Sequence, residues 1–227
     1  MRARTVILSF FIVAALLAAV FLAFAWHREI EAVSPPAPAS FAATDIERGA
    51  QLAMLGNCNT CHTTDGGAPY AGQRPLRTQF GTIYSTNITP DPDTGIGRWS
   101  EAAFTRAMRE GVDRRGRHLY PAFPYDHFTR LTDADIRALY AFMMTRQPAS
   151  AEAPRNDLAF PLNIRMTIAG WKALFFRRDG TEPDSARDEK ANRGAYLVEG
   201  IAHCGGCHTP RNLLGAEKRG QSLSGGQ

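Results

Sequence analysis

The sequence predicts an all-α protein in which small helical domains in tandem follow an N-terminal transmembrane helix. Three observations indicate this: an uncharged apolar run near the N-terminus, apolar residues at helical spacing bounded by capping residues, and one helical motif that occurs twice. With 227 residues, the chain has room for one ordinary domain or two small ones. Its 44% apolar and 21% charged residues are typical of a globular protein and argue against disorder.

The charge of the chain gives little support for nucleic-acid binding. The formal net charge is +4 at pH 7, and the basic residues are scattered along the sequence rather than gathered in one patch. We therefore expect no nucleic acid among the partners.

The first expected element is a membrane anchor within residues 1–28. Arg2 and Arg4 precede an uncharged apolar run from Val6 to Trp26, and a helix of this length is about 30 Å long, enough to cross the hydrocarbon core. A signal peptide is the alternative, because residues 23–25 resemble a cleavage site. The run is longer than the roughly 7–15 residues of a signal core, which favours an uncleaved anchor. Under both interpretations the rest of the chain is exported, because the arginines stay on the cytoplasmic side of the membrane.

Residues 29–43 are rich in proline and small residues, and we expect them to form an extended spacer between the membrane and the first domain. The first domain is expected to span residues 44–146 and to be entirely helical, since no convincing strand alternation is present. Its helices should begin at three N-terminal capping residues, and the second should stop at a glycine. These residues are Thr44, Ser100 and Thr132, followed by Gly111.

Residues 147–184 are expected to link two domains, because Pro148, Pro154 and Pro161 interrupt the helical pattern. The linker contains a group of aromatic and apolar residues, namely Trp171, Leu174, Phe175 and Phe176. We interpret this group as core packed against the first domain, and the alternative is a patch for a partner or the membrane surface. The charged run 177–190 is expected to be solvated.

One motif occurs twice in the chain. Residues 48–62 read "RGAQLAMLGNCNTCH" and residues 193–208 read "RGAYLVEGIAHCGGCH". Each copy has an Arg-Gly-Ala-x-Leu helix that leads into Cys-x-x-Cys-His. The second copy therefore marks the opening helix of a second domain, residues 185–227.

The repeated Cys-x-x-Cys-His pattern is the attachment signature of haem c. Two thiols three residues apart can reach the two vinyl-derived carbons of one porphyrin, and the following histidine then lies under the iron as its proximal ligand. The residues expected to attach haem covalently are Cys58, Cys61, Cys204 and Cys207, and the expected proximal ligands are His62 and His208.

Other uses of the cysteines fit the sequence less well. Two disulfides would need no histidine beside each pair. A zinc site with four cysteines usually brings its pairs within about 15–20 residues, whereas a whole domain separates Cys61 from Cys204. A thioredoxin-like pair expects a βαβ unit, which the sequence lacks. The motifs therefore predict two c-type haems.

Two stretches carry a resemblance to a known family: residues 84–143, which include "YSTNITPDPDTGIGRWSEAAF" and "YPAFPYDHF", and the stretch "CHTPRNLLGAEKRG". They resemble the multihaem cytochrome c subunit of bacterial membrane-bound dehydrogenases. That family includes the cytochrome subunits of alcohol, aldehyde and gluconate dehydrogenases, and of nicotinate or isoquinoline dehydrogenases of the molybdenum hydroxylase type. The resemblance implies three class I cytochrome c domains in series, so we interpret this chain as truncated after its second haem motif, with a third haem in full-length relatives.

The resemblance also implies a function. The chain would be an electron-transfer subunit without substrate chemistry of its own, held in the inner membrane by a single-pass helix with its haem domains on the periplasmic side. Electrons would come from a catalytic dehydrogenase subunit of the molybdenum hydroxylase or quinoprotein type and pass to ubiquinone or a terminal oxidase. The alternatives are a stand-alone membrane-anchored dihaem carrier and a dihaem peroxidase-like enzyme.

The distal ligand of the first haem departs from the family pattern. Family members often read "YPAMPY", in which the methionine is the expected ligand, whereas this chain has Phe123, which carries no donor atom. We favour His127, which lies close to the vacated position. His118 and Met108 are alternatives, and so is an open or water-ligated iron. A second histidine would lower the haem potential relative to methionine.

Overall fold

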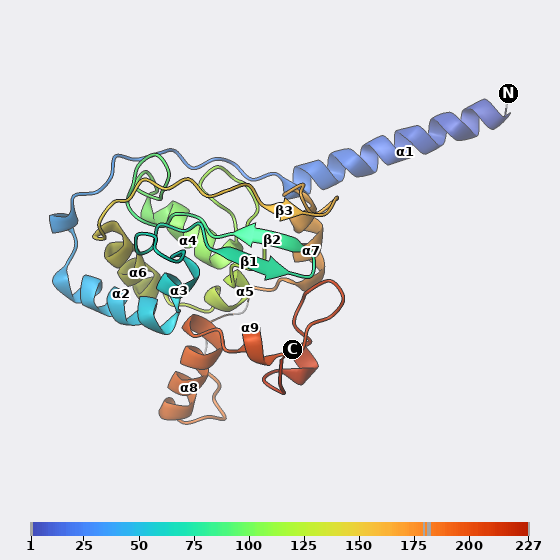
Figure 1. Ribbon diagram of the computed structural model, residues 1–227. Helices are drawn as coiled ribbons and strands as arrows, with labels where there is room; N and C mark the ends of the chain where they lie inside the picture. Colours follow the sequence, from blue (N-terminus) through green and yellow to red (C-terminus); the bar gives the residue numbers. More distant parts are fainter. Residues whose placement is uncertain (1, 179, 181–182, 227) are drawn as a thin grey trace.

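The computed structural model describes residues 2–178, 180 and 183–226, and its first element is a long helix that points away from the rest of the chain (Figure 1). This helix, α1, runs from Arg2 to Ala25. An 18-residue stretch within residues 4–25 has a mean hydropathy of 3.0, and among the described residues α1 is the one helix long and apolar enough to span a membrane. The side chains of residues 4–24 are exposed, as a helix surrounded by lipid requires.

The main body is built around two helices packed against each other, α2 (Ala43–Leu55) and α6 (Asp133–Met144). Their backbones approach closely at Gly49, where a Cβ atom would lie 2.0 Å from the carbonyl oxygen of Ala138. The shorter helices of this body are α3 (Cys58–Cys61), α4 (Glu101–Glu110) and α5 (Tyr125–Phe128). One buried apolar cluster joins these elements and includes Leu52, Met108, Phe128, Leu131, Ile136 and Leu139.

Three of the four expected helix boundaries are confirmed. The hydroxyl of Ser100 accepts a hydrogen bond from the amide of Ala103 at the start of α4. The hydroxyl of Thr132 accepts one from the amide of Asp135 at the start of α6. Gly111 ends α4 with φ of 60°, a left-handed conformation that glycine adopts without steric cost.

The expected start of the first domain helix at Thr44 was wrong. The helix α2 begins at Ala43, and its capping residue Ala42 makes no side-chain hydrogen bond. Just before this point the ring of Phe41 packs edge-on against Tyr140, with centroids 5.8 Å apart. The first turn therefore forms two residues earlier than expected, next to this tertiary contact, and Thr44 lies inside it.

The described chain also contains a small antiparallel sheet, which corrects the all-α prediction to a predominantly helical fold. The strands β1 (Pro75–Thr78), β2 (Gly81–Tyr84) and β3 (Asp157–Leu158) lie in that order, with Leu76 opposite Ile83 and Gly81 opposite Leu158. Strands of two to four residues are too short to show alternation in the sequence. The third strand also comes from the linker, so the linker is part of the first domain's surface.

The proline-rich segment after α1 lies on the domain instead of separating it from the helix. It is extended, as expected, but the amide of Ile30 donates to the carbonyl of Arg114 at 2.9 Å, and that of Val33 donates to Arg98 at 3.1 Å. A 3-10 turn at Pro38–Ser40 follows before α2 begins. The domain is therefore fixed close to the end of α1.

The aromatic group of the linker is only partly core. Its first three members belong to α7 (Thr167–Phe175), and Phe176 follows this helix directly; the buried residues of α7 are Ile168, Ala169 and Lys172. The ring of Phe176 packs edge-on against Tyr125, whereas Leu174 is exposed. The group therefore packs against the first domain along one side and leaves another side open.

The remaining elements form a separate arm beneath the first domain (Figure 1). They are α8 (Glu189–Tyr196), a π-helical segment at Leu197–Ile201, α9 (Gly205–His208) and a 3-10 turn at Arg219–Gln221. The charged run 177–190 is exposed where it is described, although its last two residues already belong to α8; positions 179, 181 and 182 lie outside the described residues.

Candidate haem attachment sites

The first Cys-x-x-Cys-His motif forms a single helical turn, α3, at the end of α2. Asn57 precedes this turn with φ of 53°, which reverses the chain after α2. Cys58 and Cys61 are both free thiols in this turn, as are Cys204 and Cys207 in the second motif. None of these four described cysteines is paired as a disulfide, and each pair is available for another use.

The surroundings of Cys58 are apolar. Its side chain packs against the buried cluster of the first domain, and this burial, followed by the nearby Cys61 thiol, raises the pKa of Cys58 to about 12. The thiol therefore stays neutral at physiological pH and lies against the kind of surface that a porphyrin ring would contact.

The imidazole of His62 is oriented by a backbone carbonyl. Its Nδ1 lies 2.6 Å from the carbonyl oxygen of Thr86, and because that oxygen can only accept, Nδ1 carries the proton. Nε2 is then the unprotonated nitrogen and can bind a metal ion. Burial lowers the pKa of His62, which also favours the neutral ring. This tautomer is the one that a proximal haem ligand requires.

Thr86 is itself held by a buried network. A Cβ atom at Gly72 would lie 2.4 Å from the carbonyl carbon of Thr86, so the two backbones are in close contact. The neighbouring Asn87 side chain donates to Ala149 at 2.7 Å and accepts from the amide of Thr89 at 2.9 Å. This network fixes the carbonyl that orients His62, and sequence reasoning missed it because a backbone acceptor leaves no trace in residue type.

The second motif forms the same turn. The amide of His208 donates to the carbonyl of Cys204 at 2.9 Å, and the amide of His62 donates to Cys58 at 2.9 Å. The turn α9 begins at Gly205, with Cys204 as its capping residue. The second copy therefore reproduces the local backbone of the first.

The two motifs lie next to each other. The segment just before the first turn is close to the second copy, since a Cβ atom at Gly56 would lie 3.0 Å from Cδ1 of Ile201. Burial raises the pKa of Cys61, Arg74 opposes this shift, and the thiol of Cys207 adds to it. Groups attached at the two motifs would therefore be neighbours.

Two polar contacts fasten the arm with the second motif to α6. The hydroxyl of Tyr196 donates to the carboxylate of Asp135 at 2.5 Å and accepts from the amide of Thr132 at 3.0 Å. Asp135 is fully buried and also pairs with Arg48, the arginine of the first repeat, at 2.5 Å. One buried carboxylate thus connects both copies of the motif.

The three residues proposed from sequence as distal ligands lie in three different places. Met108 belongs to the buried cluster against which both Cys58 and Phe123 pack. His118 packs beside the end of α1. Its Nε2 donates to the carbonyl oxygen of Ala25 at 2.9 Å, and its Nδ1 lies 3.2 Å from Nζ of Lys172. Of Met108 and His118, only Met108 therefore lies in the buried cluster beside the first motif.

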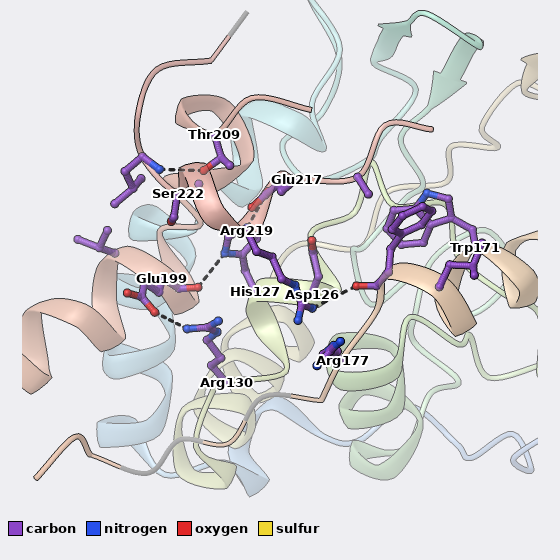
Figure 2. Close-up of a pocket in the computed structure, with 16 residues that line it drawn as sticks. Asp126, His127, Arg130, Trp171, Arg177, Glu199, Thr209, Glu217, Arg219 and Ser222 are labelled. Atoms are coloured by element: carbon purple, nitrogen blue, oxygen red, sulfur yellow. Dashed lines mark hydrogen bonds and ion pairs between the residues drawn. The ribbon is translucent and has the colours of Figure 1, made fainter. Parts of the chain in front are cut away.

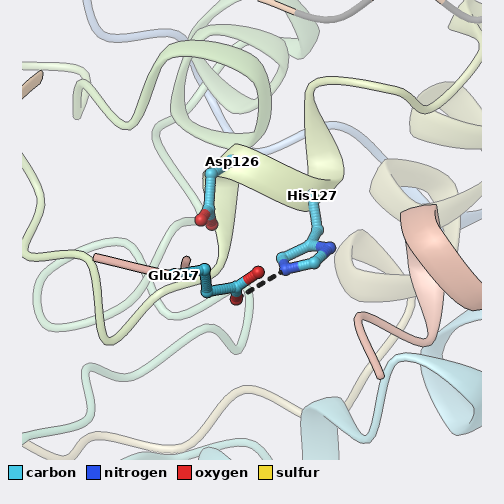
Figure 3. A group of neighbouring side chains, drawn as sticks. All are labelled: Asp126, His127 and Glu217. Atoms are coloured by element: carbon cyan, nitrogen blue, oxygen red, sulfur yellow. Dashed lines mark hydrogen bonds and ion pairs between the residues drawn. The ribbon is translucent and has the colours of Figure 1, made fainter. Parts of the chain in front are cut away.

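His127 lies against the second motif. Its Nδ1 is 2.8 Å from the carbonyl oxygen of Glu199, and its Nε2 is 3.0 Å from the carboxylate of Glu217 (Figure 3). A Cβ atom at Gly205 would lie 2.9 Å from Cε1 of His127. Both ring nitrogens thus have protein partners in this structure.

A pocket of about 430 Å³ opens between α5, α7 and the arm (Figure 2). Asp126, His127 and Glu217 lie at its wall, with ligand atoms within 4.8 Å of one another. Burial acts to lower the pKa of His127, but the hydrogen bond to Glu217 and the charge of Asp126 outweigh it and raise that pKa. The arrangement is therefore an ion pair that joins α5 to the arm.

Comparison with known proteins gives consistent matches. Residues 46–147 match the family model described as Cytochrome c. The chain is 56% identical over 205 residues to a subunit of the nicotinate dehydrogenase of Pseudomonas putida, which covers 90% of this chain and 17% of that protein. It is 45% identical over 175 residues to the gluconate 2-dehydrogenase cytochrome c subunit of Pantoea cypripedii, covering 76% of this chain and 40% of that protein.

A third relative is named as a dihaem protein. The chain is 40% identical over 188 residues to a diheme cytochrome c-type protein of Cereibacter sphaeroides, covering 80% of this chain and 63% of that protein. The chain thus spans between 17% and 63% of the length of these relatives.

Proposed function

This chain carries a cytochrome c domain and is homologous to the cytochrome c subunits of several dehydrogenases, and from this premise we propose that it relays electrons from a catalytic dehydrogenase subunit to the respiratory chain. Haem c, when bound, supplies an iron that alternates between the ferric and ferrous states and so carries one electron at a time. The observation that carries the proposal is the pair of adjacent, matching Cys-x-x-Cys-His turns with free thiols. We assign no substrate chemistry to this chain.

The residues present fit two haem groups. Cys58 and Cys61 would hold the first through thioether bonds, and His62 would be its proximal ligand through Nε2, the nitrogen that the Thr86 carbonyl leaves unprotonated. The second group would be held by the corresponding residues Cys204, Cys207 and His208. The apolar cluster beside Cys58 supports this assignment, because it provides a surface from which water is excluded.

For the sixth position of the first iron we propose His127, with Met108 and His118 as the alternatives. The proposal requires Nε2 of His127 to exchange Glu217 for iron, since that nitrogen is engaged in the present structure. If the long-wavelength absorption band of iron–methionine coordination is present and is lost in the variant Met108→Leu, Met108 is the distal ligand instead. The variant His127→Ala tests the proposal, and it should change the spectrum of one haem while Met108→Leu leaves it unchanged.

We further propose that α1 anchors the chain in the inner membrane by a single pass, with the domain on the periplasmic side. The length and apolarity of α1 and its exposed side chains support this placement. The partner we favour is a dehydrogenase of the molybdenum hydroxylase type, because the nicotinate dehydrogenase relative matches 90% of this chain. A quinoprotein partner is the alternative, since an alcohol dehydrogenase (quinone) cytochrome c subunit is 44% identical. Ubiquinone or a terminal oxidase would accept the electrons.

A stand-alone dihaem carrier is the second function to consider, and the match to a diheme cytochrome c-type protein favours it. Affinity purification of the tagged full chain from its natural host distinguishes the two. Recovery of a dehydrogenase in stoichiometric amount supports the relay subunit, and recovery of the cytochrome alone supports the carrier.

Haem content tests the cofactor assignment. Pyridine haemochrome analysis of the purified chain should give two haems per polypeptide, and the variants Cys58→Ala/Cys61→Ala and Cys204→Ala/Cys207→Ala should each retain one. A variant pair that leaves the haem count unchanged would contradict the assignment of that motif.

A further inference from the structure

The end of α1 packs against the first domain. Ala25, its last residue, is buried, and its carbonyl oxygen accepts a hydrogen bond from His118. Two residues later the ring of His27 packs edge-on against the ring of His118, with centroids 5.0 Å apart. These contacts therefore join the end of α1 directly to the domain.

The helix α7 lies against the last turns of α1. A Cβ atom at Gly170 would be 3.8 Å from the ring of Phe21. Two residues further along α7, the ammonium of Lys172 donates to the carbonyl oxygens of Glu110 and Gly111 at 2.6 and 2.7 Å. Lys172 also approaches His118, so the same helix is tied both to the end of α4 and to the end of α1.

The length of α1 places this junction at the edge of the bilayer. Its apolar span covers 22 residues, which at about 1.5 Å per residue makes about 33 Å. The hydrocarbon core is about 30 Å thick. The span has almost no length to spare, so the turn that contacts Gly170 lies at the hydrocarbon boundary when α1 crosses the membrane. The domain surface around α7 must then meet the headgroup region.

That surface exposes large apolar side chains. Figure 1 shows α1 leaving the domain beside β3 and α7, with the loop of the arm next to α7. Phe160 and Leu213, in the loops that flank α7, are 79% and 92% exposed. The side chain of Trp171 donates to the carbonyl of Leu214, which holds the second loop against α7. The exposed members of this face, here called the anchor face, are Trp26, Phe160, Ile164, Leu213 and Leu214.

We propose that the anchor face rests in the headgroup region of the membrane and holds the cytochrome domain against the bilayer. This inference depends on the proposed anchoring by α1. The face is continuous with α1, and a tryptophan directly after a membrane span is typical of the interface. Arg165, beside Ile164, donates to the carbonyl of His118 and lies at the same junction. The occupant to which we commit is lipid, because the face adjoins the end of α1 and its exposed side chains are apolar.

Site-directed spin labelling of the full haem-loaded chain tests the proposal. The chain is reconstituted alone in vesicles of phosphatidylcholine and phosphatidylglycerol, with labels on single cysteines introduced as Phe160→Cys or Leu213→Cys. The matched control is Met54→Cys, similarly exposed but on α2 at the far side of the domain. A fourth label, Leu16→Cys, reports whether α1 itself is in lipid.

We expect the ratio of relaxation by oxygen to relaxation by a water-soluble nickel chelate to be severalfold higher for the Phe160 and Leu213 labels than for the Met54 label. Values equal to that of Met54, with the Leu16 label in lipid, would overturn the anchor face and leave membrane anchoring intact. Protection only after a dehydrogenase subunit is added would assign the face to that partner instead. A Leu16 label in water would remove the anchoring itself, and the anchor face with it.

Discussion

The imidazole of His118 joins the membrane helix to the domain by donating through Nε2 to the carbonyl oxygen of Ala25 at 2.9 Å. Because Nε2 carries the proton, Nδ1 is free to accept, and it lies 3.2 Å from the ammonium of Lys172. Both side chains are buried. The neutral ring satisfies both partners at once, whereas a protonated ring would place two cations in contact.

The stability of the protein should therefore fall in weak acid. Burial, and next the charge of Lys172, lower the pKa of His118 from 6.5 to about 4. The unfolded chain binds a proton near pH 6.5 and the folded chain only near pH 4, so the free energy of unfolding decreases as the pH falls through this window. The full effect is on the order of 3 kcal/mol.

Urea denaturation of the wild type and of His118→Gln between pH 7 and pH 4 measures this. Carboxylates titrate in the same range in both proteins, so the difference between the two curves isolates His118. Parallel curves would show that His118 takes its proton as easily in the folded state as in the unfolded one.

Lys172 should stabilise the fold although its ammonium is buried. Burial lowers its pKa to about 7, but it donates to the carbonyl of Glu110 at the end of α4, where the helix supplies no further amide. The variant Lys172→Met keeps the aliphatic stem but leaves the Glu110 carbonyl without its hydrogen-bond donor. We expect this to lower the free energy of unfolding by about 1–3 kcal/mol. Lys190→Met, at an exposed position of α8, is the control and should be neutral. Equal midpoints in urea would contradict this role.

Local features of the fold were predictable from the sequence. A capping hydroxyl such as Ser100 acts on an amide three residues away, so the sequence pattern contains both partners. The same holds for the motif turns, in which the hydrogen bond from His62 to Cys58 closes over four residues. Interactions of this range need no knowledge of the tertiary structure.

Features that depend on distant segments were not predictable. The strand β3 pairs with β2 through Gly81 and Leu158, which lie far apart in the sequence, and neither strand is long enough to show its periodicity. His127 is close in sequence to Phe123, but docking of the arm brings it against Glu217. The Thr86 carbonyl that orients His62 is a backbone atom, and its role depends on how two loops pack.

The two glycines of the repeated Arg-Gly-Ala motif should respond oppositely to substitution. A Cβ atom at Gly49 would collide with the carbonyl of Ala138, so Gly49→Ala must separate α2 from α6. Overpacking of this kind costs about 1–3 kcal/mol. At Gly194 nothing lies within 4 Å of the corresponding Cβ position, and Gly194→Ala should be neutral or stabilise α8 by up to about 1 kcal/mol. Thermal unfolding followed by circular dichroism compares the two variants, and a similar loss in both would show that Gly194 is packed.

The tyrosines Tyr196 and Tyr125 provide the sharpest test of how the arm docks. The hydroxyl of Tyr196 bridges Asp135 and Thr132, whereas the hydroxyl of Tyr125 is buried without a hydrogen-bond partner among the described residues. Removing the Tyr196 hydroxyl leaves the buried Asp135 carboxylate with one hydrogen bond fewer. Removing the Tyr125 hydroxyl removes a buried polar group that has no hydrogen-bond partner among the described residues. Tyr196→Phe should therefore destabilise the protein by about 1–3 kcal/mol, while Tyr125→Phe should have no cost.

Proteolysis separates docking from global stability in the same two variants. If the Tyr196 hydroxyl holds the arm on α6, then Tyr196→Phe should accelerate cleavage between α7 and α8 more than it lowers the unfolding midpoint, because the arm opens without unfolding of the α2 and α6 core. Tyr125→Phe should leave the cleavage rate unchanged. Equal cleavage rates in both variants would mean that apolar contacts such as Ile201, which is fully buried in the first domain's cluster, hold the arm without help from the Asp135 carboxylate.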